Sequence, residues 1–217
     1  MGVSVTYFLE IQSSWCFWAE PAWAELKERF AGQVDFSWEI ALMPPEAVPA
    51  TKAECAAAYR RSGTVMRSDS MLNADWFEEE LQGDYNAANW VAEAGKGFGI
   101  KDDRLRLALS RAALVHGRKI GRMDEAVAVA VEACDLEEKS LKEAARSDAV
   151  QKRTAASTAR FAAHQLDQRP AFIIESAIGD KAVFSGIVRP EPLSAAIEAM
   201  LHDARAYASF HAHFGAP

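Results

Sequence analysis

The sequence predicts an α/β protein in which a small sheet is interrupted by a large all-helical insertion. Two runs with strand character, residues 3–9 and 34–42, lie near the start of the chain with a helical run between them. Two more such runs, 168–174 and 181–186, lie near its end. The long stretch between these groups is rich in alanine, and its apolar residues recur with helical spacing. We therefore expect one sheet domain with a helical insertion.

The first three elements form a parallel βαβ unit. Residues 3–9 are apolar on both faces, which is typical of a central buried strand. Residues 34–42 alternate between apolar and polar side chains and form the second strand. A helix joins the two strands, so we expect a right-handed parallel crossover. Pro44 and Pro45 end the second strand, because proline cannot donate a hydrogen bond to a sheet.

Residues 46–165 form the predicted insertion, and residues 1–45 and 166–217 form the sheet domain. Thr51 begins a capping box that opens the first inserted helix, and Ser62-Gly63 is expected to break that helix. Further helices are expected near residues 86–94, 105–114, 124–134, 136–146 and 148–164, and a last one near 191–201.

The composition and charge of the chain exclude several classes of protein. Half of the 217 residues are apolar, so the chain can bury a core, and a net charge of −7 argues against a nucleic-acid partner. We see no signal peptide and no apolar stretch long enough to span a membrane. The three cysteines are too widely spaced for a disulfide framework or a metal site. A cytoplasmic protein with reduced thiols is expected.

The stretch Ser13-Ser14-Trp15-Cys16 lies at the turn between the first strand and the first helix. Ser13 or Ser14 is expected to cap that helix. The free amides of a helix N-terminus carry a partial positive charge, which stabilises a thiolate. Ser13 and Cys16 are three residues apart and share one side of the first turn. The spacing is that of a two-cysteine redox motif in which Ser13 replaces the first cysteine.

Two prolines give the chain a family resemblance. Pro21 follows Cys16 by five residues, and Pro170 opens the run Pro170-Ala171-Phe172-Ile173. Both features resemble the thioredoxin superfamily, where the second proline is cis and faces the motif. The helical insertion resembles its DsbA-like branch, which includes DsbA- and FrnE-type oxidoreductases, kappa-class glutathione transferases and 2-hydroxychromene-2-carboxylate isomerases. The resemblance implies a thioredoxin-like fold with a large all-helical insertion.

The glutathione-using members of this branch carry a serine at the position of Ser13. The resemblance therefore implies that Ser13 stabilises the thiolate of glutathione, which would be a cosubstrate rather than a bound metal or prosthetic group. It also implies that the backbone of Arg169, before Pro170, pairs with the glutathione backbone. Gly186-Ile187-Val188-Arg189 replaces the usual polar run before the last helix, which leaves Arg189 to bind the γ-glutamyl end.

The expected reaction is a transfer or isomerisation on a small electrophilic or aromatic substrate. Ser14 and an exposed Trp15 would help to bind that substrate, and Arg169 would add positive potential for an anion. A homodimer is what the resemblance suggests. His164 has a smaller chance of lining the site.

Two other functions remain open. Cys16 could act as the single thiol of a DsbA- or FrnE-like oxidoreductase, which an accessible Cys16 with a perturbed pKa would support and a buried one would oppose. The chain could instead be a non-catalytic thioredoxin-fold binding protein, with Ser13 only a helix cap. The tail from Ala204 is expected to be unstructured and mobile, and metal binding by His211 and His213 is the alternative interpretation.

Overall fold

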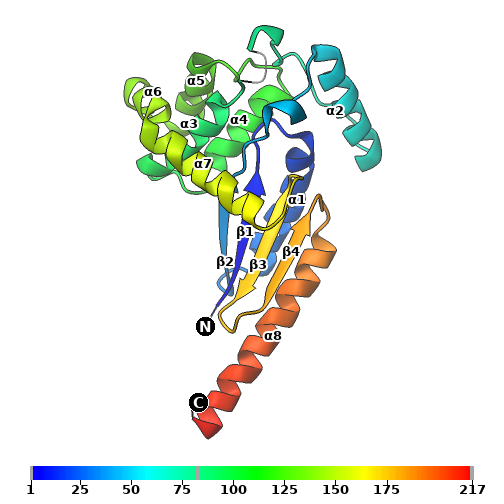
Figure 1. Ribbon diagram of the computed structural model, residues 1–217, viewed down its shortest axis with the longest axis vertical. Coiled ribbons are helices and arrows are strands. Elements are labelled where there is room, and N and C mark those ends of the chain that lie inside the picture. The colour runs from blue at the N-terminus through cyan, green and yellow to red at the C-terminus, as the bar shows by residue number, and fades with distance from the viewer. Residues whose placement is uncertain (1, 82–83, 216–217) are drawn as a thin grey trace.

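A four-stranded mixed sheet forms the centre of the protein (Figure 1). The computed structural model describes residues 2–81 and 84–215. The strands are β1 (Val3–Leu9), β2 (Val34–Ile40), β3 (Ala171–Ser176) and β4 (Lys181–Ser185), in the order β2-β1-β3-β4. The β1 strand pairs parallel with β2 and antiparallel with β3, and β3 pairs antiparallel with β4. The predicted α/β class and the βαβ start of the chain are confirmed.

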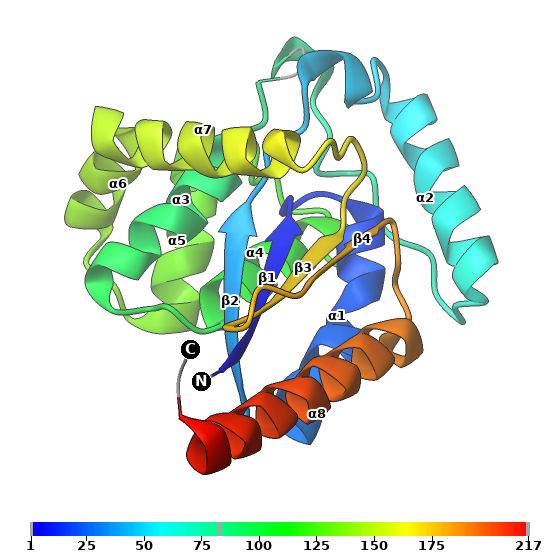
Figure 2. The same ribbon diagram turned by 60° about the horizontal axis from the view of Figure 1, so that its bottom comes forward.

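Helices cover both faces of this sheet (Figure 2). On one face lie α1 (Ser14–Arg29) and α8 (Pro190–Phe214), which contact each other. On the other face lies α7 (Asp148–Ala163), which contacts β2. The α7 helix is part of the predicted insertion, yet it packs on the sheet. One helix of the insertion therefore covers a face of the sheet.

The alternation of side chains along β1 explains this sandwich. Tyr7 faces the α1 side, where its ring stacks on Phe172 at 4.7 Å and lies 5.1 Å from Trp23. The next residue, Phe8, points the opposite way and meets Phe161 of α7 at 5.8 Å. Successive side chains of a strand point to opposite faces, so a strand with apolar residues on both faces must be covered on both.

The remaining helices form two groups beyond one end of the sheet. In both views α3 to α6 lie together on one side, and α2 stands apart on the other (Figures 1 and 2). Their bounds are α2 (Lys52–Met66), α3 (Ala87–Gly95), α4 (Arg104–Leu114), α5 (Met123–Cys134) and α6 (Glu138–Arg146), with short 3-10 turns at Pro45–Ala47, Glu79–Leu81 and Lys96–Phe98.

The prediction that Ser62-Gly63 breaks the first inserted helix is wrong, because α2 continues to Met66. The Ser62 hydroxyl donates to the Tyr59 carbonyl at 3.0 Å and accepts the indole N–H of Trp18 at 3.1 Å. A side chain at position 63 would come within 2.7 Å of the Met71 sulfur. These small residues therefore mark a close packing contact inside the helix rather than its end.

The prediction of an unstructured tail from Ala204 is also wrong, because α8 runs without a break to Phe214, and the mobility of this end stays a prediction. The last turns leave Tyr207, Phe210 and Phe214 exposed. Across residues 2–81 and 84–215, no cluster of three His, Cys, Asp or Glu side chains could hold a metal ion. In the same ranges, every helix is too short or too polar to cross a bilayer.

A buried arginine ties the helical insertion to α1. Arg106 of α4 is 2% exposed, and its guanidinium donates to Glu20 of α1 at 2.5 Å and to Asp103 at 2.6 Å. Asp103 also accepts from Lys27 at 2.6 Å and from the Trp23 indole at 3.1 Å. Every charge of this cluster has an opposite partner, so no charge is left unpaired where α4 of the insertion meets α1.

Candidate functional site

The motif forms the first turn of α1, as predicted, and Ser13 is the N-cap. Its backbone is extended, and its side-chain oxygen accepts the backbone N–H of Cys16 at 3.4 Å. The backbone N–H groups of Ser14 and Trp15 have no hydrogen-bond partner within the described part of the chain. Free amides and a hydroxyl therefore converge at one end of α1, which suits an anion.

Cys16 lies on the opposite, inward side of this turn. It is 3% exposed and belongs to the core that surrounds Tyr7. Burial raises the pKa of its thiol to about 12, although a hydrogen bond with Ser13 partly opposes that rise. Such a thiol is protonated and shielded at neutral pH, so its environment is that of a structural cysteine.

Pro170 lies at the motif end of the sheet, and its peptide bond with Arg169 is cis, as the resemblance implied. The register pairs Phe8 with Ala171, which places Pro170 beside the end of β1 that leads into the motif. The Gly186 amide donates to the Pro170 carbonyl at 2.8 Å. For the backbone N–H and carbonyl of Arg169, the described residues provide no partner.

The Arg169 side chain turns away towards the end of β2. Its guanidinium donates to the carbonyls of Ala41 and of Leu42, the latter at 2.6 Å, and lies 4.3 Å from the Phe161 ring centre. Burial lowers the pKa of this guanidinium, and the nearby Glu10 opposes that shift. Arg169 thus holds the segment after β2 in place, and its role towards an anionic substrate stays a prediction.

Glu10, at the end of β1, is a buried carboxyl group beneath the motif. It accepts the Asn89 amide at 2.7 Å and the backbone N–H of Gln12 at 2.9 Å. Burial raises its pKa, and these hydrogen bonds oppose the rise. The group links the motif loop to α3 of the insertion.

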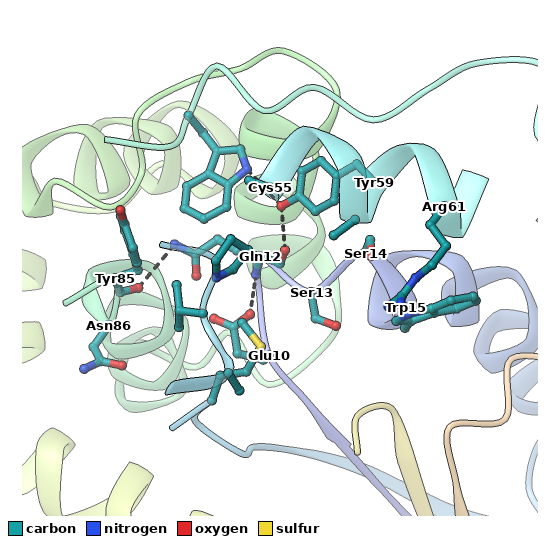
Figure 3. A pocket seen from close by; sticks show the side chains of 16 residues that line it. Glu10, Gln12, Ser13, Ser14, Trp15, Cys55, Tyr59, Arg61, Tyr85 and Asn86 are labelled. Carbon is teal, nitrogen blue, oxygen red and sulfur yellow. Dashed lines mark hydrogen bonds between the residues drawn. The ribbon is translucent and has the colours of Figure 1, made fainter. Parts of the chain in front are cut away.

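A cavity of about 180 Å³ opens beside the motif (Figure 3). Ser13, Ser14 and Trp15 line it from one side, and Tyr59 and Arg61 line it from α2. The segment after β2 and the loop before α3 contribute Met43, Ala47, Val48, Pro49, Trp76, Tyr85 and Asn86. The lining is completed by Glu10 and Gln12, which precede the motif, and by Cys55 and Ala58 of α2. The cavity therefore lies between the sheet domain and the helical insertion.

The structure brings together three of the predicted site residues in this cavity, namely Ser13, Ser14 and Trp15. Trp15 is half-buried rather than fully exposed. The other predicted residues lie outside the lining: Cys16 faces the core, Arg169-Pro170 forms the neighbouring loop, and Arg189 is an exposed residue before α8. His164 does not line the cavity either, and its ring lies 6.3 Å from Phe8 on the α7 face.

Sequence reasoning missed the residues that close the cavity from the insertion. Gln12, on the sheet-domain side of the cavity, was missed as well, although it directly precedes the motif. Tyr59 and Arg61 carry no comparable signal, because their helical spacing is that of any amphipathic helix. Only the packing of α2 over the motif reveals them.

No protein-family model matches the chain, and no curated protein matches it in sequence. Several solved structures match it in fold. One is a putative protein disulfide isomerase from Nitrosomonas europaea, with 17% identity over 97% of this chain and 100% of that one, at a TM-score of 0.67. Another is a probable DsbA oxidoreductase from Streptomyces coelicolor, with 13% identity over 91% and 89% of the two chains, at 0.68.

The cytosolic disulfide reductase DsbM from Pseudomonas aeruginosa is similar as well. Its structure has 19% identity over 92% of this chain and 98% of that one, at a TM-score of 0.68. A second structure of DsbM, with GSH, has 18% identity over 92% and 99% of the two chains, at 0.65. These likenesses extend over nearly the whole of each chain, through both the sheet and the inserted helices. The chain has the DsbA-like thioredoxin fold with its helical insertion.

Proposed function

We propose that the protein is a glutathione-dependent enzyme in which Ser13 holds the glutathione thiolate beside a small substrate. The observation that carries this proposal is that the two ends of the motif lie in different surroundings. Ser13 lines the cavity, whereas Cys16 is buried and burial raises the pKa of its thiol to about 12. Cys55 of α2 also lines the cavity, but it is 1% exposed and burial raises the pKa of its thiol to about 11. Neither thiol is ionised at neutral pH, which favours a thiol brought from outside.

The first turn of α1 offers what an incoming thiolate needs. The N–H groups of Ser14 and Trp15 have no partner among the described residues, and the helix adds its partial positive charge. The Ser13 hydroxyl now accepts a long hydrogen bond, and its proton can be directed to a sulfur anion. Donors fixed in advance around a developing or bound anion are an effective form of electrostatic stabilisation.

The loop before β3 supports a peptide-like ligand. The backbone N–H and carbonyl of Arg169 find no partner in the described part of the chain, and Pro170 follows at the motif end of the sheet. An extended backbone could pair with them as a short added strand. A protein of the same fold, DsbM, has been solved with GSH, which supports glutathione as the ligand that we propose here.

The chemistry follows from a stabilised thiolate. The glutathione thiol loses its proton to water, and the sulfur adds to an electrophilic carbon of the substrate, whose displaced electron pair takes a proton or leaves with a departing group. Retention of the new C–S bond gives a transferase. Elimination of the same thiolate after rearrangement returns glutathione and gives an isomerase.

The second candidate is a thiol oxidoreductase that uses Cys16 as a single thiol, as the names of several similar structures suggest. It would require the motif turn to open, because Cys16 is buried. A third candidate, a non-catalytic binding protein, would use the same loop and cavity without turnover.

The test is a comparison of Ser13→Ala and Cys16→Ala in a glutathione conjugation assay with a nitroaryl halide. We expect Ser13→Ala to lower the rate by roughly 10²-fold, a typical cost of removing one donor to a reacting anion. We expect Cys16→Ala to retain most of the rate. A loss confined to Cys16→Ala would support the oxidoreductase, and absence of turnover in the parent with all electrophiles tried would support the binding protein.

A further inference from the structure

The last turns of α8 extend past the body of the protein. In Figure 1 this end of the helix projects beyond the sheet, on the side away from the motif. Ala204 is the last buried residue of α8, and Arg205 donates to the side chain of Gln33 at 3.0 Å. In the described part of the chain, no side chain of α8 beyond Arg205 hydrogen-bonds to another helix or strand. Packing of α8 against the rest of the chain therefore ends near residue 205.

Three aromatic side chains form a stripe on this projecting end. Tyr207, Phe210 and Phe214 are spaced by three and four residues, so they share one face of the helix. The rings of Phe210 and Phe214 lie 5.0 Å apart. Tyr207 and Phe210 are each 54% exposed, and Phe214 is 77% exposed. A contiguous apolar surface of this kind indicates an interaction surface.

The composition of this end favours a helix that is packed against a partner. Residues 206–214 include Tyr, Phe, His and Ser, which are weaker helix formers than Ala, Leu or Lys. Isolated helices shorter than about 12–15 residues are marginal in water, and most helical stability in proteins comes from packing of an apolar face. The aromatic stripe is the face that such packing would cover.

The charges around the stripe favour a second copy of the chain as that partner. Residues 206–214 contain no Asp, Glu, Lys or Arg, so nothing there attracts a strongly charged protein. Helices that lie on membrane surfaces usually carry Lys and Arg on their polar face. A neutral stripe can meet its own copy without like-charge repulsion, and a two-fold axis makes one patch complementary to itself.

Asp203 sets the relative direction of two such helices. It is exposed on the same face as Tyr207, one turn nearer to the body. Parallel helices would bring the two Asp203 carboxylates together, which like-charge repulsion opposes. Antiparallel helices separate the carboxylates and place each one beside the tip of the other helix, where His213 and Phe214 lie.

The area of the stripe limits the strength of this association. A buried aromatic side chain removes roughly 150–250 Å² from water, so the exposed fractions of these three leave roughly 300–450 Å² on each copy. The aromatic side chains of two copies would therefore bury roughly 600–900 Å². Stable interfaces bury about 1,200–2,000 Å² in total. The area favours a weak dimer that forms at micromolar concentration or above.

We propose that the protein forms a homodimer in which the projecting ends of two α8 helices pack antiparallel through Tyr207, Phe210 and Phe214. This inference goes beyond the proposed function and does not depend on the chemistry at the cavity. The motif lies at the opposite end of the sheet from this surface (Figure 1), so both cavities stay open to their ligands in the dimer.

The test is sedimentation velocity of the parent, Phe210→Ser and Val65→Ser from micromolar to submillimolar concentration. The parent should pass from monomer to dimer as its concentration rises. Phe210→Ser should need about tenfold or more protein to reach the same dimer fraction, as for loss of a buried aromatic side chain. Val65→Ser, at an equally exposed apolar residue of α2, should behave as the parent does. A parent that stays monomeric over the whole range, or a dimer that Phe210→Ser leaves intact, would overturn the proposal.

Hydrogen exchange gives a second measurement that is local to the surface. The amides of residues 206–214 should become more protected as the concentration of the parent rises, whereas in Phe210→Ser they should exchange equally fast at low and high concentration. Protection that rises elsewhere but not at 206–214 would overturn the proposal. If the parent stays monomeric and these amides become protected on vesicles of phosphatidylcholine and phosphatidylserine, the stripe binds a membrane and the dimer is wrong.

Discussion

Two buried polar side chains join the sheet domain to the helical insertion, and they differ in how completely they are paired. Arg106 reaches across to α1 and meets Glu20 and Asp103, so its charge is balanced inside the fold. Gln12 also contacts the insertion, through the Tyr85 carbonyl, but its buried side-chain oxygen has no hydrogen-bond partner among the described residues. The paired cluster satisfies its charges within the fold, whereas the Gln12 oxygen is a buried polar atom left unsatisfied where the motif segment meets the insertion.

The largest effect is expected at the paired cluster. Arg106→Met leaves the partly buried carboxylates of Glu20 and Asp103 with one partner fewer, and removal of one partner from a buried ion pair costs about 3–5 kcal/mol. Chemical denaturation measures the change in the free energy of unfolding. The matched control is Arg104→Met on the same helix, whose partner Asp102 is exposed, and its cost should stay below about 1 kcal/mol. Similar losses in both variants would show that the cluster is not what holds the insertion.

The second largest effect concerns the reactivity of Cys16, which lies on the inward side of the motif turn. Burial raises the pKa of the Cys16 thiol to about 12, so its thiolate fraction at pH 8 should be about a thousandfold smaller than that of an ordinary thiol with a pKa near 9. Alkylation by iodoacetamide, followed by mass spectrometry of peptides, should therefore modify the half-buried Cys134 well before Cys16. Rapid modification of Cys16 in the folded protein would favour the oxidoreductase.

A smaller effect is expected from the carboxyl group beneath the motif. Burial raises the pKa of Glu10 above its ordinary value of 4.5, so the folded state binds this proton more tightly than the unfolded state. The stability that this proton provides is complete below pH 4.5 and is lost as pH rises through the higher folded value. The slope is at most about 1.4 kcal/mol for each pH unit.

The measurement is the free energy of unfolding as a function of pH for the parent and for Glu10→Gln. The variant should lack the part of the decline that starts near pH 4.5. Glu25→Gln, on the exposed side of α1, is the control and should keep it. Identical pH profiles for Glu10→Gln and the parent would mean that the Glu10 proton is held equally in both states.

The sequence predicted the part of the fold that depends on local pattern and on motif spacing. The strand at residues 3–9, the cap at Ser13 and the cis peptide bond before Pro170 are all found. Ser62-Gly63 was misleading, because small residues break a helix only where nothing packs against them, and here Trp18 and Met71 do. The division at residues 45–46 and 165–166 stays a prediction, since α7 belongs to both the insertion and the sheet sandwich.

Only the residues that the sheet domain contributes to the site could be predicted from the sequence. Ser13, Ser14 and Trp15 follow from the turn between a strand and a helix, which is a local feature. Arg106 and Tyr59 sit on helices with ordinary spacing, so their partners are set by how α4 and α2 dock on the sheet domain. Contacts of that kind depend on tertiary packing, which a single sequence does not encode in any short pattern.

The most direct test of the account is calorimetric titration of glutathione into the parent, Ser13→Ala and Cys16→Ala. The account predicts that the parent binds, that Cys16→Ala binds equally, and that Ser13→Ala loses about 1–3 kcal/mol of binding free energy, as for removal of a hydrogen bond to a charged group. Equal binding by Ser13→Ala and the parent, or no binding by either, would contradict the central claim that Ser13 holds a borrowed thiolate.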